Sequence, residues 1–312
     1  MQRRRFLRSF AAASAALPFA HAGLAAGLSG VSTHSGFSGT RPEFTLDYAP
    51  HFGMFRHHAG DDLLDQLRFM AEMGFRSMED NGMSGRTPEM QEAIAQEMTR
   101  LNMRMGVFVA HRIDWQQANL AGGDQARREE FLDDIRGAVE VAKRVNATWM
   151  TVVPGRVDQR QEMEYQTVHV VESLKRAAEI LEPHGLVMVL EPLNWWSNHP
   201  GMFLSRAPQA YMICKHVDSP ACKILFDIYH QQISEGNLIP NIEKSWDEIG
   251  YFQIGDNPGR KEPTTGEINY RNVFKYIHER GYTDILGMEH GNAGPGKEGE
   301  QALIDAYVSV DP

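Results

Sequence analysis

The chain has 312 residues, of which 42% are hydrophobic and 23% are charged. This composition is that of a globular protein with a substantial buried core, and it excludes a disordered or fibrous chain. Asp and Glu outnumber Lys and Arg by 41 to 31, for a formal net charge of −10. The acidic balance argues against a nucleic-acid partner, because such binding depends on basic side chains that displace counterions from phosphates.

The N-terminus has the pattern of an export signal. Residues 3–8 read Arg-Arg-Arg-Phe-Leu-Arg, and an alanine-rich apolar run too short to span a bilayer follows them. The arginines resemble a twin-arginine signal. We therefore expect residues 1–26 to be a signal peptide cleaved near Ala22 or Ala26, export to the periplasm by the twin-arginine translocase, and no membrane anchor in the mature form. An amphipathic N-terminal helix is the alternative, but no polar face recurs over residues 10–17.

Cleavage after Ala22 would remove four arginines and take the formal net charge from −10 to −14. Residues 27–43 are rich in Gly, Ser and Thr and are expected to form a flexible lead-in. Residues 44–312 are expected to form a single catalytic domain. Its two cysteines, Cys214 and Cys222, lie next to a predicted helix and strand, so we expect buried free thiols.

Beyond residue 44, apolar runs that predict strands alternate with stretches of helical spacing. Several predicted helices have recognisable ends, such as Thr87 before Pro88 at the start of one and Gly281 after another. The helices are expected over residues 61–73, 88–101, 127–145, 165–181, 205–216 and 269–280. The eight strands are expected to end near Pro50, Glu79, Ala110, Val153, Glu191, Asp227, Ile254 and Glu289. The last segment, 298–312, is short for an eighth helix and would leave an apolar flank that a homodimer could cover.

Strands separated by helices predict a parallel sheet, and eight such units in about 270 residues fit an α/β fold, the closed (β/α)₈ TIM barrel. An open doubly wound sheet is the alternative, but the strand count and the first turn do not match it. The loops after the strands are long, as at 111–124, 192–204 and 255–270, whereas the loops before the strands are short. Because the loops after barrel strands form the active face, chemistry is expected there.

Polar residues end four successive apolar runs in the second half of the chain: Glu191, Asp227, Gln253 and Glu289. Three converging carboxylates repel one another unless something positive neutralises them. Carboxylate and amide oxygens form a hard ligand shell, which favours one divalent ion, Mg²⁺ or Mn²⁺, with Co²⁺ also acceptable. The alternative is that each acid is a separate cap or ion-pair partner, which is harder to maintain for four consecutive strand ends.

Several blocks at these strand ends resemble the hydroxypyruvate isomerase family of the xylose isomerase-like barrels. They are Glu-Pro-Leu-Asn at 191–194, Phe-Asp-Ile-Tyr-His-Gln-Gln at 226–232, the stretch from Gln253 to Tyr270, and Gly-Met-Glu at 287–289. The resemblance covers roughly residues 44–300. Ketose 3-epimerases of the same superfamily usually carry His where this chain has Gln253, which favours the isomerase branch.

The resemblance implies roles for individual residues. Glu191, Asp227, Gln253 and Glu289 would hold the metal, and Glu191 and Glu289 would also be the catalytic pair that moves a proton between adjacent carbons. The substrate-binding residues would be His230, Arg260, Asn194, Trp195 and Glu262. In the first half of the chain, His51, Glu79 and His111 fall at strand ends, but the resemblance is weak there and lone histidines are usually structural.

The expected reaction is an aldose–ketose-type isomerisation of a small hydroxy-carbonyl substrate, hydroxypyruvate-like or sugar-derived, through an enediolate that the metal stabilises. A 3-epimerase or a dehydratase on the same scaffold is the first alternative. A non-catalytic periplasmic sugar-binding protein is the second, although binding alone does not require Glu191 and Glu289. A nuclease would be expected to carry several metal-binding histidines and a basic groove, and neither is evident.

Overall fold

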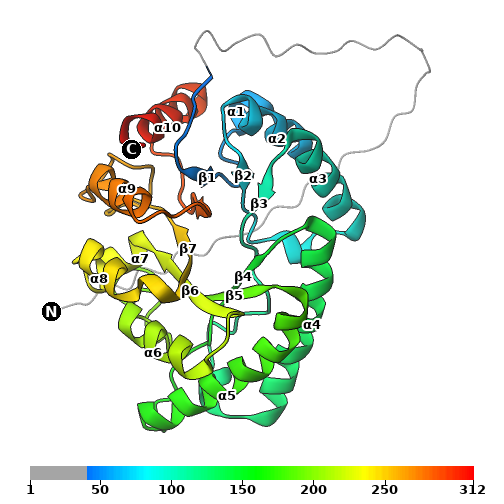
Figure 1. Ribbon diagram of the computed structural model, residues 1–312, viewed down its shortest axis with the longest axis vertical. Helices are drawn as coiled ribbons and strands as arrows, with labels where there is room; N and C mark the ends of the chain where they lie inside the picture. Colours follow the sequence, from blue (N-terminus) through cyan, green and yellow to red (C-terminus); the bar gives the residue numbers. More distant parts are fainter. Residues whose placement is uncertain (1–40) are drawn as a thin grey trace, which may run out of the picture. The chain divides into compact units, whose positions relative to one another are not determined.

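The eight strands are parallel and follow one another around a ring (Figure 1). The computed structural model describes residues 41–312, which form one compact unit. The signal-peptide prediction therefore lies outside the described residues. Six strands form one sheet in the order β1-β8-β7-β6-β5-β4, and β2 pairs with β3. The strands are β1 (Asp47–Ala49), β2 (Ser77–Met78), β3 (Arg104–Met105), β4 (Trp149–Val152), β5 (Val187–Leu190), β6 (Cys222–Asp227), β7 (Ile249–Gln253) and β8 (Ile285–Gly287).

Single parallel bridges close the ring on both sides of the β2–β3 pair. His51 pairs with Glu79 between the ends of β1 and β2, and Val109 pairs with Thr151 beside β4. The fold is therefore the predicted (β/α)₈ barrel and not an open sheet. The third strand was predicted to reach Ala110, but it ends at Met105. Residues 106–110 make only single backbone hydrogen bonds to the segments on either side, not a continuous ladder. Gly106 donates its N–H to Met78, and Ala110 donates to Thr151.

The helices lie outside the ring of strands (Figure 1). All six predicted helices are present, with ends within two residues of those expected. Thr87 and Asp62 accept backbone N–H groups of the first turn as helix caps. The α-helices are α1 (Arg56–Ala59), α2 (Leu63–Glu72), α3 (Pro88–Leu101), α4 (Gln125–Val145), α5 (Met163–Leu181), α6 (Ala207–Val217), α7 (Ile228–Ser234), α8 (Leu238–Ser245), α9 (Tyr270–Glu279) and α10 (Gly296–Val310). Among residues 41–312, no helix is long and apolar enough to cross a membrane.

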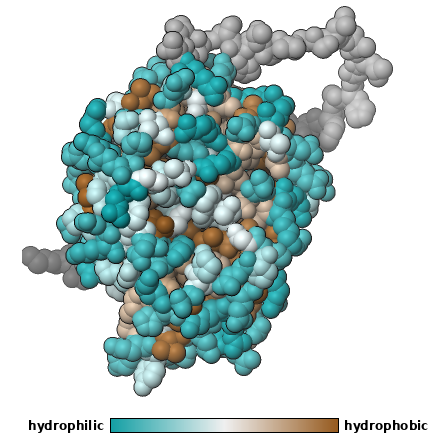
Figure 2. Space-filling model, in the orientation of Figure 1, coloured by the Kyte–Doolittle hydropathy of each residue, from teal (hydrophilic) through white to brown (hydrophobic). Residues whose placement is uncertain are grey.

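The prediction that the last segment is too short for an eighth helix was wrong. The 15 residues of α10 form a full helix that buries Leu303, Ile304 and Tyr307. The carboxylate of Glu300, which is fully buried, accepts the backbone N–H groups of His57 and His58 in α1. This contact and the buried face of α10 join the last helix to the barrel. The possible homodimer stays a prediction. The face seen in Figure 2 is mostly hydrophilic, with its hydrophobic residues in small groups.

Asp311, directly after α10, joins the last helix to the first strand. Its carboxylate accepts the backbone N–H groups of Thr45 and Leu46 and the hydroxyl of Tyr48. The last segment of the fold therefore holds the entry into β1, beside its pairing with β8.

The interior of the barrel is a packed apolar layer. Six buried side chains from different segments of the ring contact one another: Ala49, Val107, Val189, Leu225, Tyr251 and Ile285. Trp149 and Val187 pack against this layer. The polar residues at the carboxyl ends of the strands therefore lie next to a buried apolar layer. The two cysteines are free and buried, as predicted.

Candidate active site

The structure brings all four predicted metal ligands to the carboxyl ends of neighbouring strands. Glu191 follows β5, Asp227 and Gln253 are the last residues of β6 and β7, and Glu289 follows β8 by two residues. Asp227 and Gln253 are direct partners in the β6–β7 register. Asp227 and Gln253 are each 1% exposed and Glu191 is 8% exposed, so their polar groups are almost fully removed from water.

Among the described residues, one group of three side chains presents possible metal-ligand atoms within 4.8 Å of one another: Glu191, Asp227 and His230. His230 lies in α7, one turn beyond Asp227, whose carboxylate caps that helix. The Nε2 atom of His230 is 3.8 Å from Glu191 Oε1 and 3.6 Å from Asp227 Oδ2. The structure thus places His230 among the acids, whereas Gln253 and Glu289 make other contacts.

Hydrogen bonds decide which nitrogen of His230 carries the proton. The backbone N–H of Asn194 donates to Nδ1 at 3.1 Å, and the Asn194 side-chain nitrogen lies 2.6 Å from the same atom. Burial lowers the pKa of His230 to about 4, so the ring is neutral near pH 7. A neutral ring that accepts at Nδ1 holds its proton on Nε2. His230 therefore presents an N–H donor to the site, which suits contact with a substrate oxygen and not ligation of a metal.

Arg260 compensates two of the carboxylates. Its Nη2 atom is 3.2 Å from Asp227 Oδ2 and 2.5 Å from Glu289 Oε2, and its Nε donates to the Glu289 carbonyl. The guanidinium also lies over the ring of Tyr229. Burial acts to lower the pKa of Arg260, but the negative charges of Glu289 and Asp227 outweigh it and raise that pKa. Arg260 therefore stays positively charged inside the site.

Charge balance indicates that the site can accept a divalent ion. Glu191, Asp227 and Glu289 together face one arginine, which leaves two negative charges when all three are ionised. Burial, followed by the charge of Glu289, raises the pKa of Glu191 well above its usual value. Burial raises the pKa of Glu289 to about 7 against the opposing effect of Arg260. Oxygen ligands and a net charge of this size fit Mg²⁺ or Mn²⁺.

Gln253 Oε1 and His230 Nε2 are buried atoms of the site that have no hydrogen-bond partner among residues 41–312. A buried polar group without a partner costs about 1–3 kcal/mol. The amide oxygen of Gln253 is a suitable ligand for a hard ion, and the imidazole N–H is a suitable donor to a ligand oxygen. The residues present therefore fit a metal together with an oxygen-rich substrate.

Two residues of the first half of the chain complete the site, although sequence reasoning did not assign them to it. Glu79, directly after β2, is 1% exposed and lies against Gln253. Asn81 donates from its side-chain nitrogen to Glu289 Oε1 at 3.0 Å. Both residues lie just beyond a strand. The same position identified the three acids and the one amide of the second half of the chain, so it could have identified these two as well.

Asn194, Trp195 and Glu262, the remaining predicted substrate residues, make contacts within the protein. Asn194 is fully buried and holds the loop after β5 as well as His230. The Trp195 indole N–H donates to the Met202 carbonyl at 2.8 Å. The Glu262 carboxylate accepts the N–H of Ala293 and so joins the loops after β7 and β8. The structure gives these side chains loop-supporting contacts.

Aromatic rings that were not predicted lie beside the site. Trp115 stacks on His199 with ring centroids 5.0 Å apart, and His199 lies 5.5 Å from His230. Trp115 comes from the loop after β3 and His199 from the loop after β5, so two long loops form this wall. An open pocket of about 580 Å³ begins at Asn81 and continues between the loops after β2 and β3 and α4. This pocket adjoins the carboxylates through the Asn81–Glu289 contact.

His111 has a structural role, as expected for a lone histidine. Its Nε2 accepts the N–H of Val153 and its Nδ1 lies 3.2 Å from the Arg112 carbonyl. Burial lowers its pKa to about 4, so below pH 6.5 the unfolded chain binds a proton that the folded chain does not. The stability that neutral His111 allows is therefore lost as the pH falls from about 6.5 towards 4.

Replacing His111 by Gln should flatten this pH dependence. Between pH 7 and pH 5 the free energy of unfolding of the wild type should lose roughly 2 kcal/mol more than that of His111→Gln. Urea unfolding at both pH values measures the difference. His216→Gln, which changes an exposed histidine of α6, is the control and should behave like the wild type. Equal losses in the wild type and His111→Gln would show that His111 does not titrate in this way.

Comparison with known proteins agrees with the barrel fold. Residues 67–307 match the family described as xylose isomerase-like TIM barrel, so the chain belongs to that family. A solved structure of an AP endonuclease, family 2, from Brucella melitensis superposes with a TM-score of 0.71 and 27% sequence identity, over 81% of this chain and 96% of that one.

Relatives with similar sequences identify the group within this family to which the chain belongs. Hydroxypyruvate isomerase of Escherichia coli is 32% identical over 195 residues, which cover 59% of this chain and 75% of that protein. A 2-oxo-tetronate isomerase of Cupriavidus necator is 29% identical over 246 residues, or 76% of this chain and 89% of that protein. Within the barrel family, the chain belongs to the hydroxypyruvate isomerase group, and it is an isomerase.

Proposed function

We propose that the protein is a divalent-metal-dependent isomerase that interconverts the aldose- and ketose-type forms of a small hydroxy-carbonyl acid. The observation that carries the proposal is a cluster of buried acids: Asp227 and Glu289 share Arg260, and Glu191 lies close to Asp227. The amide oxygen of Gln253, also buried at these strand ends, lacks a partner among the described residues. The names of the relatives, hydroxypyruvate isomerase and 2-oxo-tetronate isomerase, support a substrate of this size and charge.

Glu191, Asp227, Gln253 and Glu289 would hold the ion, with Mg²⁺ or Mn²⁺ preferred. The bound dication would stabilise the negative charge that develops on the oxygens of the enediolate. Glu191 and Glu289 would carry the proton from one carbon to its neighbour. Burial raises the pKa of each carboxyl group above its ordinary value, which makes the carboxylate a stronger base toward a carbon-bound proton.

Arg260 and His230 would bind the substrate. With the dication on the carboxylates, the guanidinium of Arg260 becomes available to an anionic group, and the N–H on His230 Nε2 can donate to a hydroxyl or carbonyl oxygen.

Incubation with hydroxypyruvate or a longer 2-keto hydroxy acid in heavy water tests the reaction. An isomerase moves the carbonyl from carbon 2 to carbon 3, which gives an aldehyde from hydroxypyruvate and a 3-keto acid from the longer substrate, with solvent deuterium on carbon 2. The reaction should stop after removal of divalent ions. A single epimeric ketose would instead indicate a 3-epimerase, and loss of water a dehydratase. Binding without any exchange would refute the isomerase and favour a sugar-binding protein.

We also propose export to the periplasm by the twin-arginine pathway, based on residues 3–8. A folded chain could then carry its ion outwards in a site that was filled before export. Appearance of the mature chain in the periplasm of cells without the twin-arginine translocase would contradict this route.

A further inference from the structure

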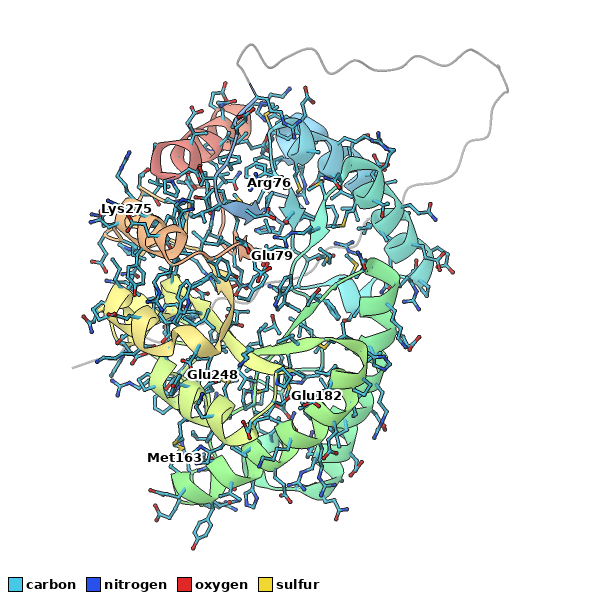
Figure 3. All side chains as sticks on the ribbon, in the orientation of Figure 1. Arg76, Glu79, Met163, Glu182, Glu248 and Lys275 are labelled. Atoms are coloured by element: carbon cyan, nitrogen blue, oxygen red, sulfur yellow. The ribbon has the colours of Figure 1, made fainter. Side chains whose placement is uncertain are left out.

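Glu79 is a buried acid for which the proposed reaction has no use. It lies within the ring of strands (Figure 3) and is 1% exposed. Among the described residues no cationic side chain forms an ion pair with it, and its polar contacts come from Tyr251 and Gln253. A buried carboxyl group without a cation is expensive, so stability does not explain its presence.

The barrel makes room for this carboxyl group with two glycines. A Cβ atom on Gly287, in β8, would overlap the Glu79 carboxyl group. A Cβ atom on Gly106, after β3, would overlap the Tyr251 hydroxyl and lie 3.1 Å from the Glu79 Cβ. Larger residues at either position would force Glu79 or Tyr251 out of place. Segments from three different strands therefore accommodate one acidic side chain.

All polar contacts of the Glu79 side chain go to β7. The Tyr251 hydroxyl donates to Oε2 at 3.1 Å, and the side-chain nitrogen of Gln253 lies 3.3 Å from Oε1 and 3.4 Å from Oε2. With its nitrogen facing Glu79, Gln253 turns its oxygen away from the carboxyl group. That oxygen is buried and has no partner. The reverse orientation would set the amide oxygen against the carboxyl oxygens.

We propose that Glu79 is a positioning residue that fixes the side-chain amide of Gln253 with its oxygen facing the divalent ion. This role rests on the proposed metal site. An amide is a ligand only through its oxygen, and the two ends of the group have nearly the same shape, so packing alone cannot orient it. A hydrogen-bond acceptor beside the amide nitrogen decides which end of the amide faces the ion. Partners of this kind typically contribute 10- to 100-fold to metal affinity.

The test is the affinity of the full-length metal-free protein for Mn²⁺, measured by titration calorimetry. Glu79→Gln keeps the shape of the side chain but offers both a donor and an acceptor, so Gln253 can adopt either orientation. We expect the Kd for Mn²⁺ to rise by about 10- to 100-fold. Glu248→Gln is the matched control, because Glu248 is also buried but pairs with Lys215 and Lys223 before the start of β7. It should leave the Kd within about threefold of the wild type.

A second pair of variants separates positioning from simple loss of charge. In Gln253→Glu both ends of the side chain are oxygens, so no partner is needed to orient it toward the ion. Adding Glu79→Gln to Gln253→Glu should therefore not raise the Kd for Mn²⁺ by more than about threefold. If Glu79→Gln does not fold, Glu79→Asp, which withdraws the carboxyl group from the amide, should weaken Mn²⁺ binding in the same way.

The outcomes are distinguishable. A Kd for Glu79→Gln within about threefold of the wild type overturns the positioning role, as does an equal loss in the Gln253→Glu background. A wild-type protein that binds no Mn²⁺ refutes the proposed metal site itself. Weaker binding of Mn²⁺ by Glu79→Gln that does not recur in the Gln253→Glu background supports the proposal.

Discussion

Glu191→Gln is expected to lower turnover by about 10²–10⁴-fold, the usual contribution of a positioned acid–base group. The substitution keeps the size of the side chain but removes the group that can accept a proton. It also removes one of the carboxylates proposed to hold the ion, so the Kd for Mn²⁺ should rise in the same variant. Steady-state assays at saturating Mn²⁺ separate the loss of proton transfer from the loss of metal.

Glu97→Gln is the control for this experiment. Glu97 is a largely buried glutamate of α3 that pairs with Arg68 and Arg100, outside the barrel. Its loss should affect stability and leave turnover unchanged. Near-normal turnover by Glu191→Gln with a full complement of metal would exclude Glu191 as an acid–base group.

Arg260→Met should have opposite consequences in the metal-free and metal-loaded protein. Without divalent ions, the variant leaves Asp227 and Glu289 close together with no cation, and the free energy of unfolding should fall by about 3 kcal/mol. With excess Mn²⁺ this difference should shrink, because the dication compensates the same carboxylates. Urea unfolding in EDTA and in Mn²⁺ measures both states.

The same variant tests substrate binding. If the guanidinium binds the anionic group of the substrate, KM should rise on the order of 30-fold, equivalent to about 2 kcal/mol, with a smaller change in kcat. Arg112→Met is the control, because Arg112 forms a largely exposed ion pair with Asp134 and should lose less than about 1 kcal/mol. An unchanged stability in EDTA would mean that Arg260 does not compensate the carboxylates, and an unchanged KM would remove it from the substrate site.

The barrel and half of its site follow from local patterns in the sequence. An apolar run that ends in an acid fixes where a buried strand emerges, and parallel strands emerge on one rim, so Asp227 and Gln253 could be predicted to lie together and are register partners. The helix ends were predictable for a similar reason, since caps such as Thr87 act within a few residues.

Contacts across the barrel could not be predicted in this way. Glu79 meets Tyr251 and Gln253 across 172 and 174 residues of sequence, and no local pattern encodes that encounter. The direction in which a loop side chain points could not be predicted from the sequence either. Asn194 and Glu262 belong to blocks that resemble a known family, yet their polar groups bond to the protein itself. The short helices α7 and α8 were missed because Gly236, with φ of 59°, separates two turns too brief to show a period.

The contacts of Asp311 with Thr45 and Leu46 join segments about 265 residues apart in sequence. Loops of that length close slowly, so this seam between α10, β1 and β8 is expected to be the last part of the ring to assemble. Until then the partly assembled barrel exposes the unpaired edges of two strands, which attract other chains. The open edge that a chaperone would bind therefore lies along β1 and β8, and β8 is the strand that leads to Glu289.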